Sequence, residues 1–182
     1  MPLPQPDLGD LEPGDEVSVE EVPHQWTTHV NSLARQLALQ AIYEIDSAGH
    51  PVGEVIDHLI SAYDTPLPAD VVSLMRVLVI GVSKHRARID AAIQPFAPEF
   101  PVKHLAVVDR NVLRLAIFEF VIAQLVPMGV AIDEAVSLAK AFGSDSSPRF
   151  VNGVLGNLME DSALVARMRA ENDPASSMID DA

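Results

Sequence analysis

The sequence predicts an all-α protein, a bundle built from two packed helical halves. Apolar residues recur at helical spacing in six stretches, no stretch alternates at the period of a strand, and prolines and glycines separate the stretches. The hydrophobic fraction of 48% is too high for a chain that is disordered throughout. The length of 182 residues suits one domain with tails.

Three helices are expected in the first half of the body, over residues 28–47, 52–63 and 69–94. Each carries apolar residues three and four positions apart, which form one stripe along a helix. Gly49 suits the left-handed residue that follows a helix, and Pro51 prevents continuation of the first helix. Prolines cluster after the third helix, so we expect the boundary between the halves near residue 97.

The second half is expected to contain helices over residues 107–125 and 130–142, and a last helix from residue 147 to about residue 170. The 107–125 helix is apolar on nearly every face, which is typical of a helix at the centre of a fold. Arg110 and Arg114 lie one turn apart on this helix. They therefore need a groove, a partner or a place at the surface.

Acidic residues are concentrated at the two ends of the chain, whose net charge is −14. Residues 1–23 carry seven acids, no base and five of the 14 prolines, which predicts an acidic disordered tail. Residues 171–182 carry four acids and no base, which predicts a second acidic tail. The body, residues 24–170, divides into halves at about 24–97 and 98–170, and its 15 acids and 12 bases leave it nearly neutral. The first tail has two open interpretations: a solubilising segment, or an arm that competes with a polyanion for a basic face.

The N-terminus lacks the basic and apolar regions of a signal peptide, and no apolar run reaches the ~18 residues that a membrane span needs. The expected location is therefore the cytoplasm, with no membrane partner. The absence of cysteine excludes a disulfide framework, a thiolate metal site and a cysteine nucleophile.

The usual motifs of catalysis, cofactor binding and metal binding are missing from the sequence. There is no phosphate-binding glycine-rich loop, no dinucleotide fingerprint and no nucleophile elbow. The six histidines include no pair at metal-ligand spacing. Asp133 and Glu134 are adjacent carboxylates, but at the start of a helix they more simply complement its dipole. We therefore expect no enzymatic activity, no cofactor and no metal.

Basic residues are few, so their positions indicate where a polyanion could bind. Residues 84–88, Lys-His-Arg-Ala-Arg, form the one cluster, in a part of their helix where cations also complement the dipole. Arg35, Arg76 and Arg149 interrupt apolar patterns, and a guanidinium suits a phosphate or a stacked base. Phe150, beside Arg149, offers a ring for base stacking, although its periodicity favours the core.

Several blocks of sequence point to one known family. Residues 34–43 read Ala-Arg-Gln-Leu-Ala-Leu-Gln-Ala-Ile-Tyr, and residues 109–119 read Asp-Arg-Asn-Val-Leu-Arg-Leu-Ala-Ile-Phe-Glu. Residues 127–140 read Pro-Met-Gly-Val-Ala-Ile-Asp-Glu-Ala-Val-Ser-Leu-Ala-Lys, and residues 147–155 read Ser-Pro-Arg-Phe-Val-Asn-Gly-Val-Leu. In order and spacing, these blocks resemble the NusB family of transcription antitermination factors over residues 28–160.

The resemblance implies an all-α fold of two helical subdomains and no catalysis. It implies binding of boxA-type single-stranded RNA of ribosomal RNA transcripts, together with the ribosomal protein NusE. The complex helps RNA polymerase to read through terminators. The RNA contacts that the motifs imply are Arg35, Gln40, Arg76, Arg149, Phe150 and Asn152. The implied NusE contacts are Tyr43, Gly81 and Lys84.

Some features leave alternatives open. The family usually carries basic residues just before its opening block, whereas residues 27–33 carry no formal positive charge here. Because each lost phosphate contact lowers affinity, one alternative is a protein–protein adaptor that binds NusE with weak or no independent RNA affinity. Another is a helical domain similar to the N-terminal part of ribosomal-RNA cytosine methyltransferases, although the chain is too short to include the catalytic domain. Asn152 could instead form a cap or a buried hydrogen bond between the halves. A homodimer through the apolar flank of the first helix could cover the RNA face.

Overall fold

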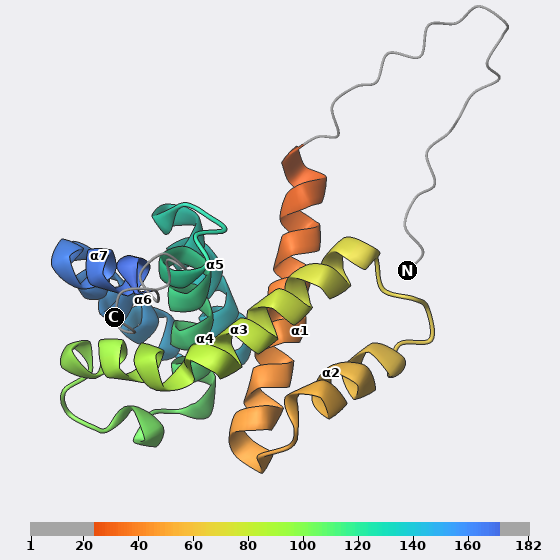
Figure 1. The fold of residues 1–182 in the computed structure, drawn as a ribbon, viewed down its shortest axis with the longest axis horizontal. Coiled ribbons are helices and arrows are strands. Elements are labelled where there is room, and N and C mark those ends of the chain that lie inside the picture. Colours follow the sequence, from red (N-terminus) through yellow and green to blue (C-terminus); the bar gives the residue numbers. More distant parts are fainter. Residues whose placement is uncertain (1–23, 172–182) are drawn as a thin grey trace, which may run out of the picture.

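The computed structural model describes residues 24–171, and every regular element in this range is a helix (Figure 1). The predicted tail over residues 1–23 lies outside the described range, and so does the second tail apart from Glu171. None of the described helices is both long and apolar enough to cross a membrane. The helices are α1 His24–Ala48, α2 Val52–Ser61, α3 Ala69–Ile93, α4 Val107–Ile117, α5 Met128–Phe142, α6 Ser147–Glu160 and α7 Ser162–Ala170, with 3-10 turns at Gln94–Phe96 and Val102–His104.

Helix α4 lies at the centre of the fold, as its apolar sequence predicts. It packs against α1, α3, α5 and α6, and every residue from Asn111 to Ile117 is buried. The core around it is aliphatic, and Leu113, Ile117 and Leu155 are fully buried. Burial on most sides explains why apolar residues occupy most of its surface, while its polar residues need partners on other helices.

The two halves of the chain pack closely together. Helices α1 and α2 lie on one side and α5, α6 and α7 on the other, while α3 crosses α1 and extends to the end of the molecule where α7 lies (Figure 1). Helix α3 contacts α1 and α2 in the first half and α4 and α6 in the second. The predicted all-α bundle of two packed halves is therefore confirmed.

The loop between α1 and α2 forms as its glycine predicts. Gly49 has a φ of 72°, in the left-handed region, and its N–H donates to the Ile45 carbonyl over 3.0 Å. This bond satisfies one of the last carbonyls of α1. Pro51 then precedes α2 in an extended conformation, so the two helices form a short helical hairpin.

Two helix predictions need correction. The predicted helix over 107–125 is α-helical only to Ile117 and continues as a π-helical turn, Phe118–Ile122. The predicted last helix is interrupted at Asp161, whose carboxylate accepts a hydrogen bond of 2.9 Å from the Leu164 N–H and so begins α7. The apolar periodicity continues across this break and conceals it, since Leu164 and Met168 are also buried.

Candidate nucleic-acid interface

Arg35 lies inside the protein and joins α1 to the second half of the chain. Its Nε and terminal nitrogen donate to both Glu119 carboxylate oxygens at 2.6–3.1 Å, and Glu134 Oε2 lies 3.5 Å away. Burial alone would lower the pKa of Arg35, but the Glu119 hydrogen bonds and the charges of Glu119 and Glu134 outweigh it and raise the pKa. With 2% of the residue exposed, Arg35 is unavailable to RNA in this structure. In this structure Arg35 links α1 to the second half of the chain, and its predicted contact with RNA stays a prediction.

Gln40 and Tyr43 line a groove of about 450 Å³ on the surface of α1. The groove lies between α1, the segment after α2, the start of α4 and the end of α5. Tyr43 is 45% exposed, and both side chains face an apolar floor that includes Val108. A mixture of amide and phenol groups over apolar residues can stack on flat groups and can bind an apolar side chain. The groove residues are Leu33, Gln36, Leu37, Leu39, Gln40, Tyr43, Tyr63, Val108 and Phe142.

Arg149, Phe150 and Asn152 lie together in the first turns of α6. Arg149 and Asn152 are exposed, while Phe150 is half-buried against the core and also lines two shallow surface pockets. Phe150 is therefore in part a core residue, and its predicted contact with RNA stays a prediction. The side chain of Asn152 is exposed and forms no hydrogen bond within residues 31–171, which argues against the alternative of a buried link between the halves.

The two pockets beside Phe150 extend this surface across the loop after α3. One pocket, of about 290 Å³, places Phe150 with Phe96, Phe100 and Leu105, and Phe100 is 58% exposed. The other, of about 400 Å³, places Phe150 with Phe96 and Arg149. Phe96 and Phe100 were not predicted as site residues, because the prolines of residues 95–101 predict only a rigid connection. Aromatic residues within such a connection were the available signal.

Arg76 lies apart from both surfaces. It is on α3, where its guanidinium pairs with Asp57 of α2 at 3.2 Å, and both side chains are exposed. Arg76 lines neither the α1 groove nor the pockets beside Phe150. The structure therefore does not bring it together with the other predicted RNA contacts.

Gly81 and Lys84 lie further along α3. A Cβ atom at Gly81 would fall within the ring of Phe118, so this position requires a residue without a side chain for α3 to pack on the π-helical turn. His85 stacks on the same ring with centroids 6.1 Å apart. Lys84 is exposed and forms no ion pair in the described range. Gly81 therefore has a packing role, and neither residue lines the groove that contains Tyr43.

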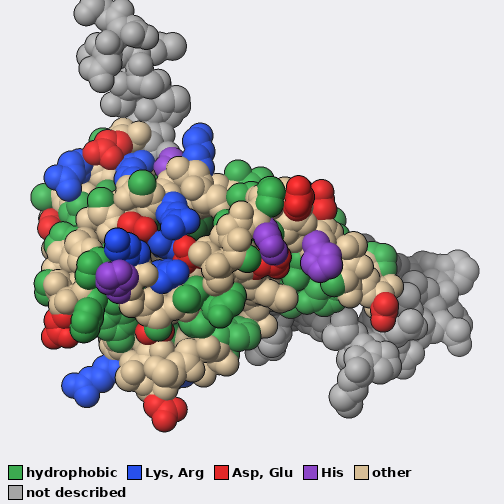
Figure 2. Space-filling view, turned by 90° about the horizontal axis from the view of Figure 1, so that it is seen from below, with side chains coloured by type: hydrophobic (Ala, Val, Ile, Leu, Met, Phe, Trp, Pro, Cys, Tyr) green, Lys and Arg blue, Asp and Glu red, His purple; other side chains and the backbone are tan. Residues whose placement is uncertain are grey.

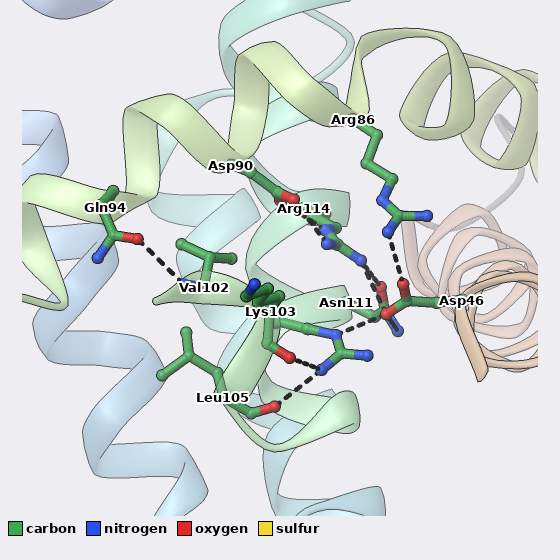
Figure 3. A network of polar contacts seen from close by, with 10 residues as sticks. Asp46, Arg86, Asp90, Gln94, Val102, Lys103, Leu105, Asn111 and Arg114 are labelled. Carbon is green, nitrogen blue, oxygen red and sulfur yellow. Dashed lines mark hydrogen bonds and ion pairs between the residues drawn. The ribbon is translucent and has the colours of Figure 1, made fainter. Parts of the chain in front are cut away.

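Arg110 and Arg114 pair with carboxylates on other helices, and Figure 3 shows Arg114 between Asp46 and Asp90. Asp46 of α1 accepts from Arg110 Nε at 2.6 Å and from Arg114 at 2.9 Å, and Arg86 lies 3.3 Å from its other oxygen. Asp90 of α3 accepts two hydrogen bonds of 2.7 Å from Arg114. This network joins α1, α3 and α4, so the predicted need of Arg110 and Arg114 for a partner is met inside the fold.

The charges in this network reinforce one another. Burial alone would raise the pKa of Asp46, but the Arg110 hydrogen bond and the charges of Arg114, Arg110 and Arg86 outweigh it, so the pKa is lowered. Burial likewise opposes the charge of Arg114, yet Asp90 and Asp46 raise its pKa. Both groups therefore remain ionised near neutral pH. The network is a structural link rather than a free anion site.

Basic side chains gather over one end of the molecule. Figure 2 views the molecule from below Figure 1 and shows most of the Lys and Arg side chains of that face at the left, on the side where Figure 1 places the C-terminal end of α3. Among the described residues, no group of three or more His, Asp or Glu side chains could hold a metal ion. The fold and these surfaces thus define an all-α protein that carries a groove on α1, two shallow pockets beside Phe150 and a concentration of basic side chains on its exterior.

Comparison with known proteins identifies the family. The sequence profile of the NusB family matches residues 32–160, and the chain belongs to this family. A transcription antitermination protein NusB from Dehalococcoides mccartyi is 44% identical over 138 residues, which cover 76% of this chain and 95% of that protein. The NusB protein of Chloroflexus aggregans is 42% identical over 127 residues, covering 69% and 83%.

Solved structures of the family have the same fold. T. maritima NusB superimposes with a TM-score of 0.64 and 27% identity, covering 72% of this chain and 91% of that one. A crystal structure of antitermination factors NusB and NusE in complex with double-stranded RNA gives a TM-score of 0.66 and 25% identity, covering 72% and 97%. Helix α7 lies beyond the matched residues 32–160.

Proposed function

We propose that this chain is an RNA-binding factor of transcription antitermination that binds boxA-type single-stranded RNA together with the ribosomal protein NusE. One observation carries the proposal: a free guanidinium, a partly exposed ring and an unpaired amide lie within four residues at the start of α6. The ring of Phe150 offers a stacking surface, Arg149 a phosphate contact and Asn152 a base-edge contact. Family membership and the NusB–NusE complex with RNA support the same role.

The α1 groove is the surface we propose for NusE. Tyr43, Tyr63 and Phe142 are each more than 40% exposed there, and exposed aromatic residues are enriched at protein interfaces. Gln40, beside Tyr43, would then contact either partner where RNA and NusE meet. Arg76, Gly81 and Lys84 lie on α3, so contacts through them would require a second surface.

The broader assignment follows from this binding role. We infer a non-enzymatic factor that joins the antitermination complex of RNA polymerase in the cytoplasm. A homodimer formed through the apolar flank of α1 would cover the groove and would compete with NusE. Light scattering with and without NusE tests this, because a dimer that persists in the NusE complex would contradict the competition.

A second function has its own observation in favour. Arg35 is engaged by Glu119 and Glu134, and residues 27–33 carry no formal positive charge, so two expected sources of phosphate contacts are lost. Such a chain would bind RNA weakly by itself and would act as an adaptor that binds NusE. The two functions differ in whether RNA binding requires NusE.

A binding titration separates the two functions. Labelled boxA RNA is titrated with the full chain at about 50 and about 200 mM salt, with and without NusE. RNA binding by the chain alone that weakens steeply with salt supports the first function, and binding that requires NusE supports the adaptor. Arg149→Ala tests the site at α6, and Lys140→Ala, an exposed cation at the end of α5, is the charge-matched control. Equal affinity of both variants and the parent would remove α6 from the interface.

A further inference from the structure

A small pocket lies between the second half of α3 and α7, outside the surfaces described above. Its volume is about 190 Å³, and its walls are both charged and apolar. Helix α7 supplies three of its seven lining residues and Glu171, directly after the helix, supplies a fourth; all four lie beyond the residues that match the family. The pocket therefore lies partly outside the residues that the family profile matches. Its lining residues are Arg88, Ala91, Ala92, Leu164, Arg167, Met168 and Glu171.

Two arginines with spare hydrogen-bonding capacity line the pocket. A terminal N–H group of Arg88 donates a hydrogen bond to the Met168 carbonyl, and this bond links α7 to α3. Its Nε is buried and has no aligned hydrogen-bond acceptor among the described residues, although Glu171 Oε2 lies 3.0 Å away. Arg167 is exposed and forms no ion pair within the described part of the chain. Guanidinium groups in this state suit a phosphate, because its oxygens can accept several N–H bonds at once.

Glu171 is the one acidic residue of the pocket. Its side chain is 52% exposed, and it meets Arg88 as a misaligned ion pair rather than as a bonded one. Lys84 lies one turn before Arg88 on α3, so it adds positive charge close to the pocket. Burial first, and then the charges of Arg88 and Lys84, lower the pKa of the neighbouring His85, which agrees with a positive local potential.

The pocket and the surface beside Phe150 are both built on the C-terminal end of α3 and the residues that follow it. Ala91 and Ala92 line it on α3, and Phe96, which follows within two helical turns, lines both pockets beside Phe150. The helical rise of about 1.5 Å per residue separates Arg88 from Phe96 by roughly 12 Å along the chain. A short stretch of an extended nucleic-acid strand spans such a distance.

We propose that the α3–α7 pocket binds a backbone phosphate of the RNA strand, and that the Glu171 carboxylate occupies this anion position when RNA is absent. The inference rests on the proposed RNA-binding function and extends it to α7. Arg167 and the Nε of Arg88, once Glu171 has moved away from it, would contact the phosphate while bases stack near Phe96 and Phe150. Glu171 would then act as an internal competitor whose displacement limits affinity.

The test uses the full chain and a labelled boxA-type oligoribonucleotide at two salt concentrations. Glu171→Gln keeps the shape and removes the competing charge, so we expect affinity to rise about two- to fivefold, the scale of one exposed ion pair. Arg167→Ala should weaken binding by a similar factor of about two to five and reduce the salt slope by about 0.7, the value for one phosphate contact of a single strand. Arg167→Lys should keep the slope, and Lys140→Ala should match the parent chain.

Each outcome decides the proposal. Unchanged affinity in both Glu171→Gln and Arg167→Ala, while the parent binds RNA, would overturn the pocket and leave the RNA-binding function intact. An equal loss in Lys140→Ala would show a general charge effect and would also overturn it. Competition by inorganic phosphate at constant ionic strength, without any change in the salt slope of Arg167→Ala, would assign the pocket to a free anion instead. Failure of the parent to bind RNA at either salt concentration would refute both proposals.

Discussion

Replacing Glu119 with alanine removes the carboxylate that holds Arg35 inside the fold. The two side chains are 3% and 2% exposed, and hydrogen bonds of 2.6, 2.9 and 3.1 Å join them. The variant would leave the guanidinium buried with only Glu134, whose nearer contact is 3.5 Å. Breaking a buried pair from one side costs about 3–5 kcal/mol, so we expect Glu119→Ala to lower the free energy of unfolding by that amount.

A double variant separates the buried charge from the loss of packing. Arg35→Met with Glu119→Leu replaces the pair by apolar side chains, and such exchanges are often neutral. We expect the double variant to recover most of the stability that Glu119→Ala loses. Urea unfolding followed by far-UV circular dichroism measures both, with a shift of midpoint at unchanged slope as the readout. Asp57→Ala breaks the exposed pair with Arg76 and should cost less than about 1 kcal/mol.

The same variants decide the role of Arg35 in RNA binding. If Arg35 is structural, the folded double variant keeps the RNA affinity and salt slope of the parent chain. If the double variant folds but its RNA affinity depends less steeply on salt, by the amount expected for one phosphate contact, the structural role of Arg35 would be refuted. A Glu119→Ala variant that loses less than about 1 kcal/mol would refute the energetic reasoning, because the buried guanidinium would then need no partner.

Three further predictions concern stability. The pKa of Asp46 is lowered in the folded state, so its contribution to the free energy of unfolding is fully present above the ordinary aspartate pKa of about 3.9. This contribution is lost as the pH falls through the lower pKa of the folded state. The urea midpoint of Asp46→Asn should therefore vary less with pH in that acid range than the midpoint of the parent chain. Gly81→Ala should lower the free energy of unfolding by about 1–3 kcal/mol, because its methyl group would enter the Phe118 ring. Gly53→Ala, with open space around its Cβ, should raise the free energy of unfolding by about 0.5–1 kcal/mol. Thermal melting compares the two variants, and equal effects would contradict the packing argument. Gln124 has a φ of 50°, so Gln124→Gly should raise the free energy of unfolding by up to about 1 kcal/mol, and a loss on urea unfolding would show that this backbone is not strained.

The helices could be predicted because the spacing of apolar residues within each segment indicates which face of the helix is buried. The apolar stripes of α1 and α3 and the largely apolar sequence of α4 indicate their places before any contact is known. The break at Asp161 was missed because the apolar period continues through α7, although an aspartate within such a run was a capping signal. Among the site residues, Arg149, Phe150 and Asn152 lie together because they are neighbours on one helix.

Contacts between segments far apart in the chain could not be predicted from the sequence. Arg35 looks like a phosphate ligand until Glu119, 84 residues away, is known to face it. Gly81 looks like part of a partner surface until the ring of Phe118 is seen against it. In both cases the deciding neighbour belongs to another helix, and no local spacing encodes it.

The sequence by itself determined the fold class, the order of the helices and the family, because these depend on periodicity and on local motifs. Only the tertiary structure decided which arginines are free and which are neutralised. Asp46 collects Arg86, Arg110 and Arg114 from two other helices, while Arg149 and Arg167 remain exposed. The availability of a charge depends on its partners in space, and folding brings those partners together from positions far apart in the chain.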